Sequence, residues 1–129
     1  MRPTRVLVCD DFMSLRAMVR LVLELDGTFE VVGEAQDGQE AVELGGELEP
    51  DIVLLDLSMP RKDGLEALPE IREAAPGASV VVYSGIDRSA VEAKALSLGA
   101  AAFVQKGVTA EELVDALREL ARNGGGGQR

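Results

Sequence analysis

The sequence predicts an α/β protein in which a doubly wound, five-stranded parallel sheet is covered by five helices. Short apolar runs of strand length recur along the chain and alternate with stretches that have helical apolar spacing. Several of these runs are apolar without alternation, which is typical of strands that helices cover on both faces. Because crossover connections are right-handed, few strand orders remain, and we expect the order 2-1-3-4-5.

The first strand, helix and second strand follow from the N-terminal third of the chain. An apolar run at residues 5–9 ends in Asp10 and Asp11, and a helical pattern continues from about residue 12 to residue 25. A second apolar run at residues 30–35 lies between turn-forming residues and predicts the next strand.

The second helix and the third strand occupy the middle of the chain. The helix contains Gly45 and Gly46, each of which costs roughly 1 kcal/mol relative to alanine, so packing must stabilise it. In the stretch at residues 51–60, a short apolar run ends at Asp56. Ligands of open α/β sheets bind beyond the carboxyl ends of the strands, so Asp56 is placed to face a crevice.

The third helix is expected at residues 65–75. Because Pro69 lacks an amide donor and clashes with the preceding turn, we expect a kink there, or a regular helix only from about Leu68. An apolar run at residues 79–83 then predicts a fourth strand that ends at Ser84.

The last elements are a helix at residues 89–98, a strand at residues 101–105 that ends at Lys106, and a final helix. The final helix begins with Thr109 and Glu112, which have the spacing of a capping box.

The domain is expected to span residues 1–122. Residues 123–129 contain four consecutive glycines, which cannot bury enough surface to offset their ordering entropy, so a flexible tail is expected there.

Composition limits the classes of function. The chain has 129 residues, 47% of them hydrophobic, which suits one domain, and its net charge of −10 argues against direct binding of nucleic acid. Cys9 is the only cysteine, so no internal disulfide can form, and no apolar run reaches the length of a membrane span. We therefore expect a cytoplasmic protein without membrane contact. The sequence has no histidine, so a phosphohistidine would have to come from another protein.

Three acids are predicted to meet at the carboxyl end of the sheet. In the expected order the first and third strands are neighbours, about 4.8 Å apart, which brings Asp10, Asp11 and Asp56 together. Such a cluster needs a cation, and its carboxylate oxygens suit Mg²⁺. An alternative is that Asp10 and Asp11 only cap the first helix. Capping would explain one aspartate, but it explains poorly why two stand beside Asp56, since their mutual repulsion costs stability.

A hydroxyl and an ammonium are predicted beside these acids. Ser84 ends the fourth strand, and Lys106 ends the fifth, roughly 10 Å from Asp56, a gap that a lysine stem can largely cross. A carboxylate, a magnesium site, a hydroxyl and an ammonium together fit a phosphoryl group that arrives at Asp56.

These residues resemble the receiver domain of bacterial two-component response regulators, which has a flavodoxin-like fold, and in particular the single-domain regulators of the chemotaxis type. The resemblance covers residues 5 to about 122 and rests on Asp10-Asp11, Asp56 within Asp-Leu-Ser-Met-Pro, the run Met-Pro-Arg-Lys-Asp-Gly, Ser84 and Lys106.

The resemblance implies that Asp56 accepts a phosphoryl group from the phosphohistidine of a sensor histidine kinase or a histidine phosphotransfer protein. It implies that Mg²⁺ is held by Asp11, Asp56 and the Ser58 carbonyl, and that Asp10 acts mainly through a metal-bound water. Such a domain is a signalling module rather than an enzyme, although it catalyses phosphotransfer onto its own aspartate and the slow hydrolysis of the product.

The resemblance also implies a conformational switch. Ser84 would turn toward the phosphoryl group while Phe103 swings inward, and the surface of the fourth helix, fifth strand and fifth helix would then bind a downstream protein or a second copy of the chain. Plain core packing is the alternative role for Phe103. In the family, the first helix docks the kinase, and Met18, Leu21 and Leu25 give that helix a second apolar stripe here.

The chain departs from the family pattern near the site. Gly107 stands where a proline usually follows the lysine, so we expect a trans peptide or a loop adapted to glycine. Gly85 replaces the commoner alanine and leaves room for the phosphoryl group. Ser58 and Ile86 occupy positions that tune hydrolysis in the family, and apolar Ile86 is expected to hinder the attacking water.

We expect a stand-alone receiver domain, although a fragment of a longer regulator would have the same motifs. The alternatives are a metal-dependent phosphatase with an aspartate nucleophile, a flavodoxin-like nucleotide binder, and a receiver-like interaction module that does not use phosphate. The phosphatases place a second acid two residues after the nucleophile, where this chain has Ser58. The nucleotide binder would need a glycine-rich loop after the first strand, where this chain has Asp11 and Phe12.

Overall fold

The computed structural model describes residues 2–85 and 87–122, which form five strands and five helices in strict alternation. The strands are β1 (Thr4–Cys9), β2 (Phe29–Ala35), β3 (Ile52–Leu55), β4 (Ser79–Ser84) and β5 (Ala102–Gln105). The helices are α1 (Met13–Asp26), α2 (Gly38–Leu48), α3 (Gly64–Ala74), α4 (Arg88–Ser97) and α5 (Ala110–Arg122). The predictions for Ile86 and for the tail at 123–129 lie outside the described residues.

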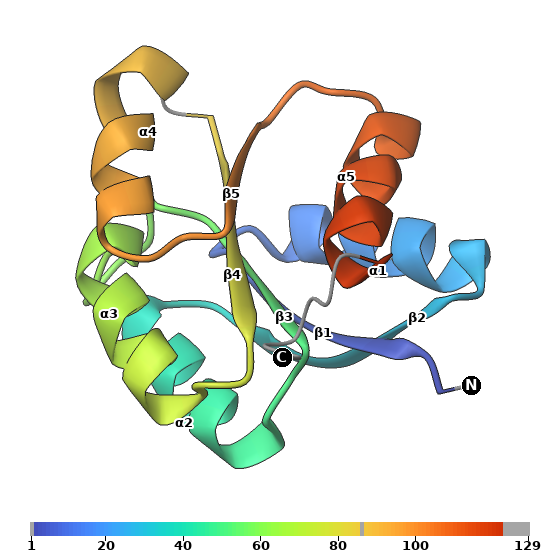
Figure 1. Ribbon diagram of the computed structural model, residues 1–129, viewed down its shortest axis with the longest axis horizontal. Helices are drawn as coiled ribbons and strands as arrows, with labels where there is room; N and C mark the ends of the chain where they lie inside the picture. Colours follow the sequence, from blue (N-terminus) through green and yellow to red (C-terminus); the bar gives the residue numbers. More distant parts are fainter. Residues whose placement is uncertain (1, 86, 123–129) are drawn as a thin grey trace.

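The sheet has the predicted topology. Its strand order is β2-β1-β3-β4-β5, and every neighbouring pair is parallel. Helices α1 and α5 cover one face of the sheet, and α2, α3 and α4 cover the other (Figure 1). Because all the strands run in one direction, the residues that follow them gather at one edge of the sheet.

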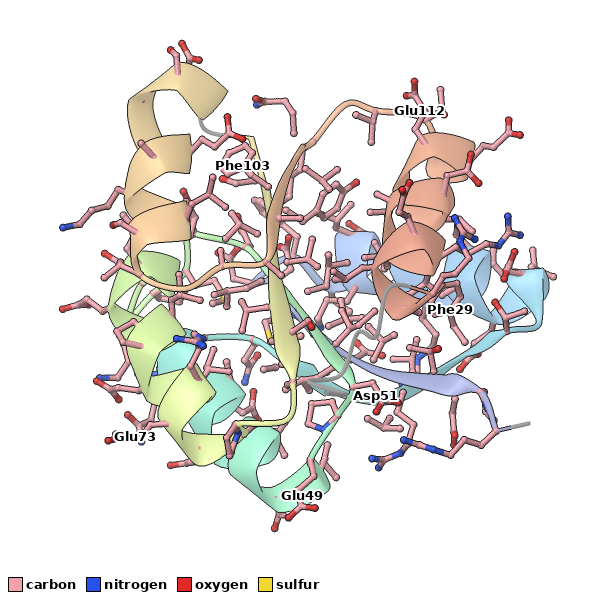
Figure 2. The ribbon with its side chains drawn as sticks, viewed as in Figure 1. Phe29, Glu49, Asp51, Glu73, Phe103 and Glu112 are labelled. Atoms are coloured by element: carbon pink, nitrogen blue, oxygen red, sulfur yellow. The ribbon has the colours of Figure 1, made fainter. Side chains whose placement is uncertain are left out.

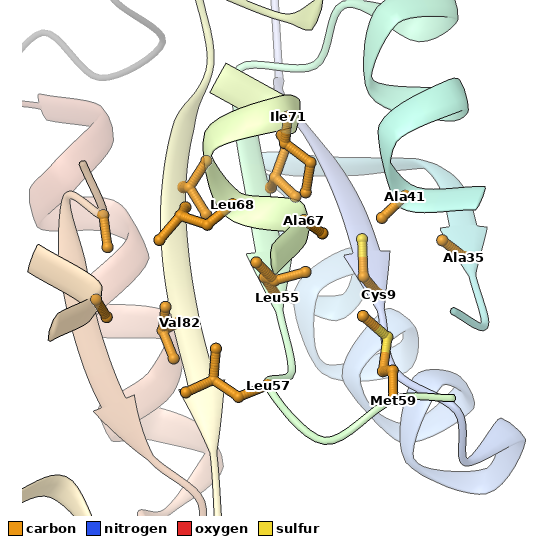
Figure 3. Close-up of a cluster of buried hydrophobic side chains, with 14 of the residues drawn as sticks. Cys9, Ala35, Ala41, Leu55, Leu57, Met59, Ala67, Leu68, Ile71 and Val82 are labelled. Atoms are coloured by element: carbon orange, nitrogen blue, oxygen red, sulfur yellow. The ribbon is translucent and has the colours of Figure 1, made fainter. Parts of the chain in front are cut away.

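Both faces of the sheet are buried, as the unbroken apolar runs predicted. In β1, Leu7 and Cys9 belong to the cluster on the side of α2, α3 and α4, whereas Val6 and Val8 belong to the cluster on the side of α1 and α5. Figure 3 shows the first cluster, in which Cys9 lies near side chains from α2 and α3 while Val82 of β4 lies farther away. Alternate residues of a strand point to opposite faces, so each central strand contributes to both clusters.

Packing stabilises α2 despite its glycines. A Cβ on Gly45 would lie 3.8 Å from Ile71 of α3, and one on Gly46 would lie 3.5 Å from Ala74 of the same helix. The two glycines therefore face α3, as expected for a helix that depends on tertiary contacts.

The expectation that α3 is regular only from about Leu68 was wrong. The helix begins at Gly64 and continues through Pro69. Asp63 and Glu66 form a capping box there: the Glu66 amide donates to Asp63 (2.9 Å) and the Asp63 amide donates to Glu66 (3.3 Å). This reciprocal pair fixes the first turn before the proline is reached.

The capping box predicted for α5 is confirmed. The Thr109 amide donates to Glu112 Oε1 (2.8 Å), and the Glu112 amide donates to Thr109 Oγ1 (3.0 Å). In the loop before it, Gly107 has φ 108°, and no peptide bond of the described residues is cis. The glycine-adapted loop is therefore present. None of the helices in the described segments is long and apolar enough to cross a lipid bilayer.

Candidate functional site

The three predicted acids meet beyond the carboxyl ends of β1 and β3. The Asp56 amide donates to the Cys9 carbonyl (3.0 Å), so the strand pairing carries Asp56 directly beside the end of β1. One carboxylate oxygen from each of Asp10, Asp11 and Asp56 lies within 4.8 Å of the others. Asp10 and Asp56 are buried and Asp11 is exposed, so the cluster opens to solvent on one side.

Asp10 has a structural contact as well. Its Oδ1 accepts the amide of Phe12 (2.9 Å), the residue that precedes α1. This bond stabilises the turn that leads into α1, but it does not cap the helix, whose N-cap residue is Phe12. The other oxygen of Asp10 remains directed to the cluster, where it accepts from Lys106.

Lys106 reaches from the end of β5 into the cluster, as its stem length predicted. Its Nζ donates to Asp10 Oδ2 at 2.6 Å and lies 3.5 Å from Asp56 Oδ2. The Lys106 amide donates to the Ser84 carbonyl (2.8 Å), which fixes the start of the side chain against β4. One ammonium therefore bridges two buried carboxylates that come from different strands.

Lys106 and Asp56 each influence the pKa of the other. Burial raises the pKa of Asp56 above its usual 3.8, and the Asp10 charge raises it further, while Lys106 opposes both. Burial alone would lower the pKa of Lys106, but the hydrogen bond to Asp10 and the charge of Asp56 raise it above its usual 10.5. The site therefore favours the charged form of Lys106 and disfavours the charged form of Asp56.

The chemistry of the donor set fits Mg²⁺. Three carboxylates against one ammonium leave excess negative charge, all the side-chain donors are hard oxygens, and the exposed Asp11 gives access from solvent. Ser58 lies on the loop after β3, with its amide 3.3 Å from Asp56 Oδ1, so its backbone is next to the cluster.

The two predicted switch residues lie on β4 and β5. Ser84 ends β4 and is fully buried. A Cβ on the following Gly85 would have no atom within 4 Å, so the space at that glycine is open. Phe103 is 5% exposed and belongs to the core, on the side of β5 that faces α4 (Figure 2). This burial agrees with core packing, and a change between two states stays a prediction.

Two residues that contact the site were not predicted from the sequence. The Arg16 guanidinium donates to the Asp10 carbonyl (2.5 Å) and to Glu34 (3.0 Å), which holds the turn between β1 and α1. The Tyr83 ring centroid lies 5.8 Å from Lys106 Nζ. Arg16 follows the acids by little more than one helical turn, a spacing that could have marked it, whereas nothing in the sequence marks Tyr83.

Comparison with known proteins agrees with this geometry. The family model for the response regulator receiver domain matches residues 6–118. The chain is 39% identical to the chemotaxis protein CheY of Listeria monocytogenes over 118 residues, which cover 92% of this chain and 98% of that protein. It is 36% identical to the nitrate/nitrite response regulator NarL of Escherichia coli over 92% of this chain, but over only 55% of that longer protein.

A solved structure gives the same result for the fold. The signal receiver domain of the response regulator NarL from Mycobacterium tuberculosis superposes with a TM-score of 0.88 at 38% identity. The superposition covers 95% of this chain and 98% of that one. The likeness therefore includes the whole sheet and the helices on both of its faces.

Proposed function

This chain belongs to the response regulator receiver domain family, and from that premise we propose that Asp56 accepts a phosphoryl group from the phosphohistidine of a sensor histidine kinase or a histidine phosphotransfer protein. The observation that carries the proposal is the contact of Lys106 with both Asp10 and Asp56 at 2.6 Å and 3.5 Å. Asp56 is a buried carboxylate with an ammonium and two further acids beside it, an arrangement that suits a transferring phosphoryl group.

In the proposed step, an Asp56 carboxylate oxygen attacks phosphorus as the bond from phosphorus to the histidine nitrogen breaks. The nitrogen keeps the electron pair of that bond, and Asp56 becomes an acyl phosphate. Lys106 lies where it can offset charge on the phosphoryl oxygens, which needs no proton transfer because its pKa is raised.

Mg²⁺ would be held by Asp11, Asp56 and the Ser58 carbonyl, with Asp10 acting mainly through a metal-bound water. When bound, the ion neutralises charge on the phosphoryl group. The same site would hydrolyse the acyl phosphate slowly, so the chain is proposed as a signalling domain and not as a turnover enzyme. Residues 1–122 would form this domain, in the cytoplasm, where a kinase can supply the phosphoryl group.

The proposed output is a change on the surface of α4, β5 and α5. Phosphorylation adds a charge of about −1.5 to −2, which recruits hydrogen-bond donors. Ser84 is buried at the end of β4, the strand next to the one that Asp56 follows, which supports a movement of its hydroxyl toward Asp56 on phosphorylation. Repacking of Phe103 would pass this movement to the surface, where a downstream protein or a second phosphorylated copy would bind.

The proposed kinase-docking surface is the outer face of α1. Leu21 and Leu25 are 58% and 76% exposed, Met18 is 41% exposed, and Phe12 and Met13 extend the apolar surface toward the acids. An exposed stripe of this kind favours a partner that presents an apolar helix face. The net charge of −10 makes nucleic acid an unfavourable direct partner.

We predict that Leu21→Ser slows phosphotransfer to this chain from purified, phosphorylated kinase domains of the host by about tenfold, as for the loss of an interface anchor. Phosphorylation by a small acyl phosphate needs no docking and should be unchanged. Equal rates for the variant and the wild type with every kinase domain that phosphorylates the chain would refute this surface.

The proposed function is tested by incubating the chain with Mg²⁺ and a small acyl phosphate and then weighing the intact protein. The wild type should gain the mass of one phosphoryl group, and Asp56→Asn should gain none. No gain in the wild type, or an equal gain in the variant, contradicts the proposal. Catalytic release of phosphate from many phosphate esters would favour the metal-dependent phosphatase instead.

A further inference from the structure

The loop between β3 and α3, residues 57–63, has a contact that the proposed chemistry does not use. Nε of Arg61 donates to Asp37 Oδ2 (3.0 Å), and a terminal guanidinium nitrogen donates to the same oxygen. The other Asp37 oxygen accepts the Glu40 amide (2.8 Å), because Asp37 is the N-cap of α2. The Asp37 side chain is 5% exposed. A buried carboxylate of α2 therefore holds the tip of this loop.

Arg61 has a backbone conformation that an arginine adopts only under constraint. Its φ is 65°, and the Lys62 amide donates across it to the Pro60 carbonyl (2.7 Å), which closes a γ-turn. This type of γ-turn is strained for a residue with a Cβ, so it costs stability. The ion pair of the Arg61 side chain with Asp37 is a favourable contact that can offset this cost.

The backbone of α2 touches the same part of the loop. A Cβ on Gly38 would lie 1.9 Å from the Lys62 carbonyl oxygen, so only glycine permits this approach. At the other end of the loop, the Gly64 amide donates to the Leu57 carbonyl (2.9 Å). Figure 3 shows Met59, from the middle of the loop, within the core cluster. The base and the middle of the loop are thus fixed independently, and Asp37 fixes its tip.

The conformation of this loop matters because its first residues lie beside the acid cluster. Asp56 immediately precedes the loop, and the Ser58 amide lies 3.3 Å from its carboxylate. We infer that Arg61 is a positioning residue, whose ion pair with Asp37 holds the loop so that the Ser58 carbonyl is presented to Mg²⁺. The inference rests on the proposed function, since it assigns Mg²⁺ to this cluster.

Charge alone predicts the opposite effect of Arg61. A guanidinium near a cation site opposes Mg²⁺, so a variant without it should bind Mg²⁺ more tightly if charge were its only influence. A positioning role predicts weaker binding. The sign of the change therefore separates the two roles.

The test measures the binding of magnesium chloride to the full chain by titration calorimetry. Arg61→Gly removes the guanidinium and also relieves the left-handed strain, and Asp37→Asn keeps a capping oxygen but removes the charge. Each should raise the Mg²⁺ dissociation constant by about tenfold, the size typical of residues behind a metal ligand. The double variant should be no weaker than either single one, because both remove the same contact.

Lys62→Ala is the matched control. It removes a cation from the same loop, but that ammonium pairs with Glu70 (3.1 Å) and not with Asp37. Mg²⁺ affinity should stay unchanged or rise slightly in this variant. Arg61→Lys, which keeps the charge, should restore part of the affinity lost in Arg61→Gly. Circular dichroism and thermal unfolding confirm that each variant is folded.

A kinetic readout separates positioning from general damage. With a small acyl phosphate, Arg61→Gly should need more Mg²⁺ for half-maximal phosphorylation but reach the wild-type rate at saturation, because Asp56 and Lys106 are unchanged. Wild-type or tighter Mg²⁺ binding in Arg61→Gly and Asp37→Asn would overturn the role of Arg61 and leave the proposed function intact. Failure of the wild type itself to bind Mg²⁺ would instead refute the metal site.

Discussion

At the scale of the single residue, Asp56 is held in a charged state that the folded protein disfavours. Burial and the neighbouring Asp10 raise the pKa of Asp56, so between pH 3.8 and the raised value the folded chain binds more protons than the unfolded chain. The free energy of unfolding therefore falls as the pH rises through this window. The negative charge of Asp56, the proposed nucleophile, thus destabilises the folded domain when no Mg²⁺ is bound.

We predict that Asp56→Asn raises the free energy of unfolding at pH 7 without Mg²⁺, because it removes the buried negative charge. The gain should shrink as the pH falls through the pKa of Asp56, because the wild-type carboxyl is then neutral as well. Urea unfolding in EDTA at several pH values measures both effects. Glu73→Gln, at an exposed position, is the control and should change little. A variant that is less stable than the wild type at pH 7 would contradict the assignment.

At the scale of the element, α2 has glycines with opposite roles. Gly38 begins the helix where the Lys62 carbonyl approaches it, whereas Gly46 faces Ala74 with ordinary contact distance. Gly38→Ala should destabilise the domain by about 2 kcal/mol, because a backbone carbonyl would have to move. Gly46→Ala should stabilise it by up to about 1 kcal/mol through helix propensity. Urea denaturation of the two variants checks this, and equal effects of both would show that the approach at Gly38 is unimportant.

At the scale of the whole molecule, Mg²⁺ binding should stabilise the fold, because the acids meet only when β1 and β3 are paired. At a Mg²⁺ concentration ten times the dissociation constant, the free energy of unfolding should rise by roughly 1.4 kcal/mol. The rise should disappear in Asp11→Asn. Because the net charge is −10, the comparison must be made at constant ionic strength. A rise of equal size with a monovalent salt would indicate screening instead of binding.

The strand order and the acid cluster could be predicted because apolar runs that end in polar residues mark the strand ends. Asp10, Asp56 and Lys106 each follow such a run, and a parallel sheet brings strand ends to one edge. The pairing of Arg61 with Asp37 could not be predicted, because it depends on a left-handed turn that no local pattern specifies. The early start of α3 could be predicted from the spacing of Asp63 and Glu66, which form its capping box, even though Pro69 disfavours a helix.

Asp56 is the residue that we propose carries the phosphoryl group. Treatment of the acyl phosphate-labelled chain with sodium borohydride converts an aspartyl phosphate to homoserine, which peptide mass spectrometry then locates. We predict homoserine at position 56 alone, and only when Mg²⁺ is present during labelling. Homoserine at position 10 or 11, or none at all under these conditions, would contradict it.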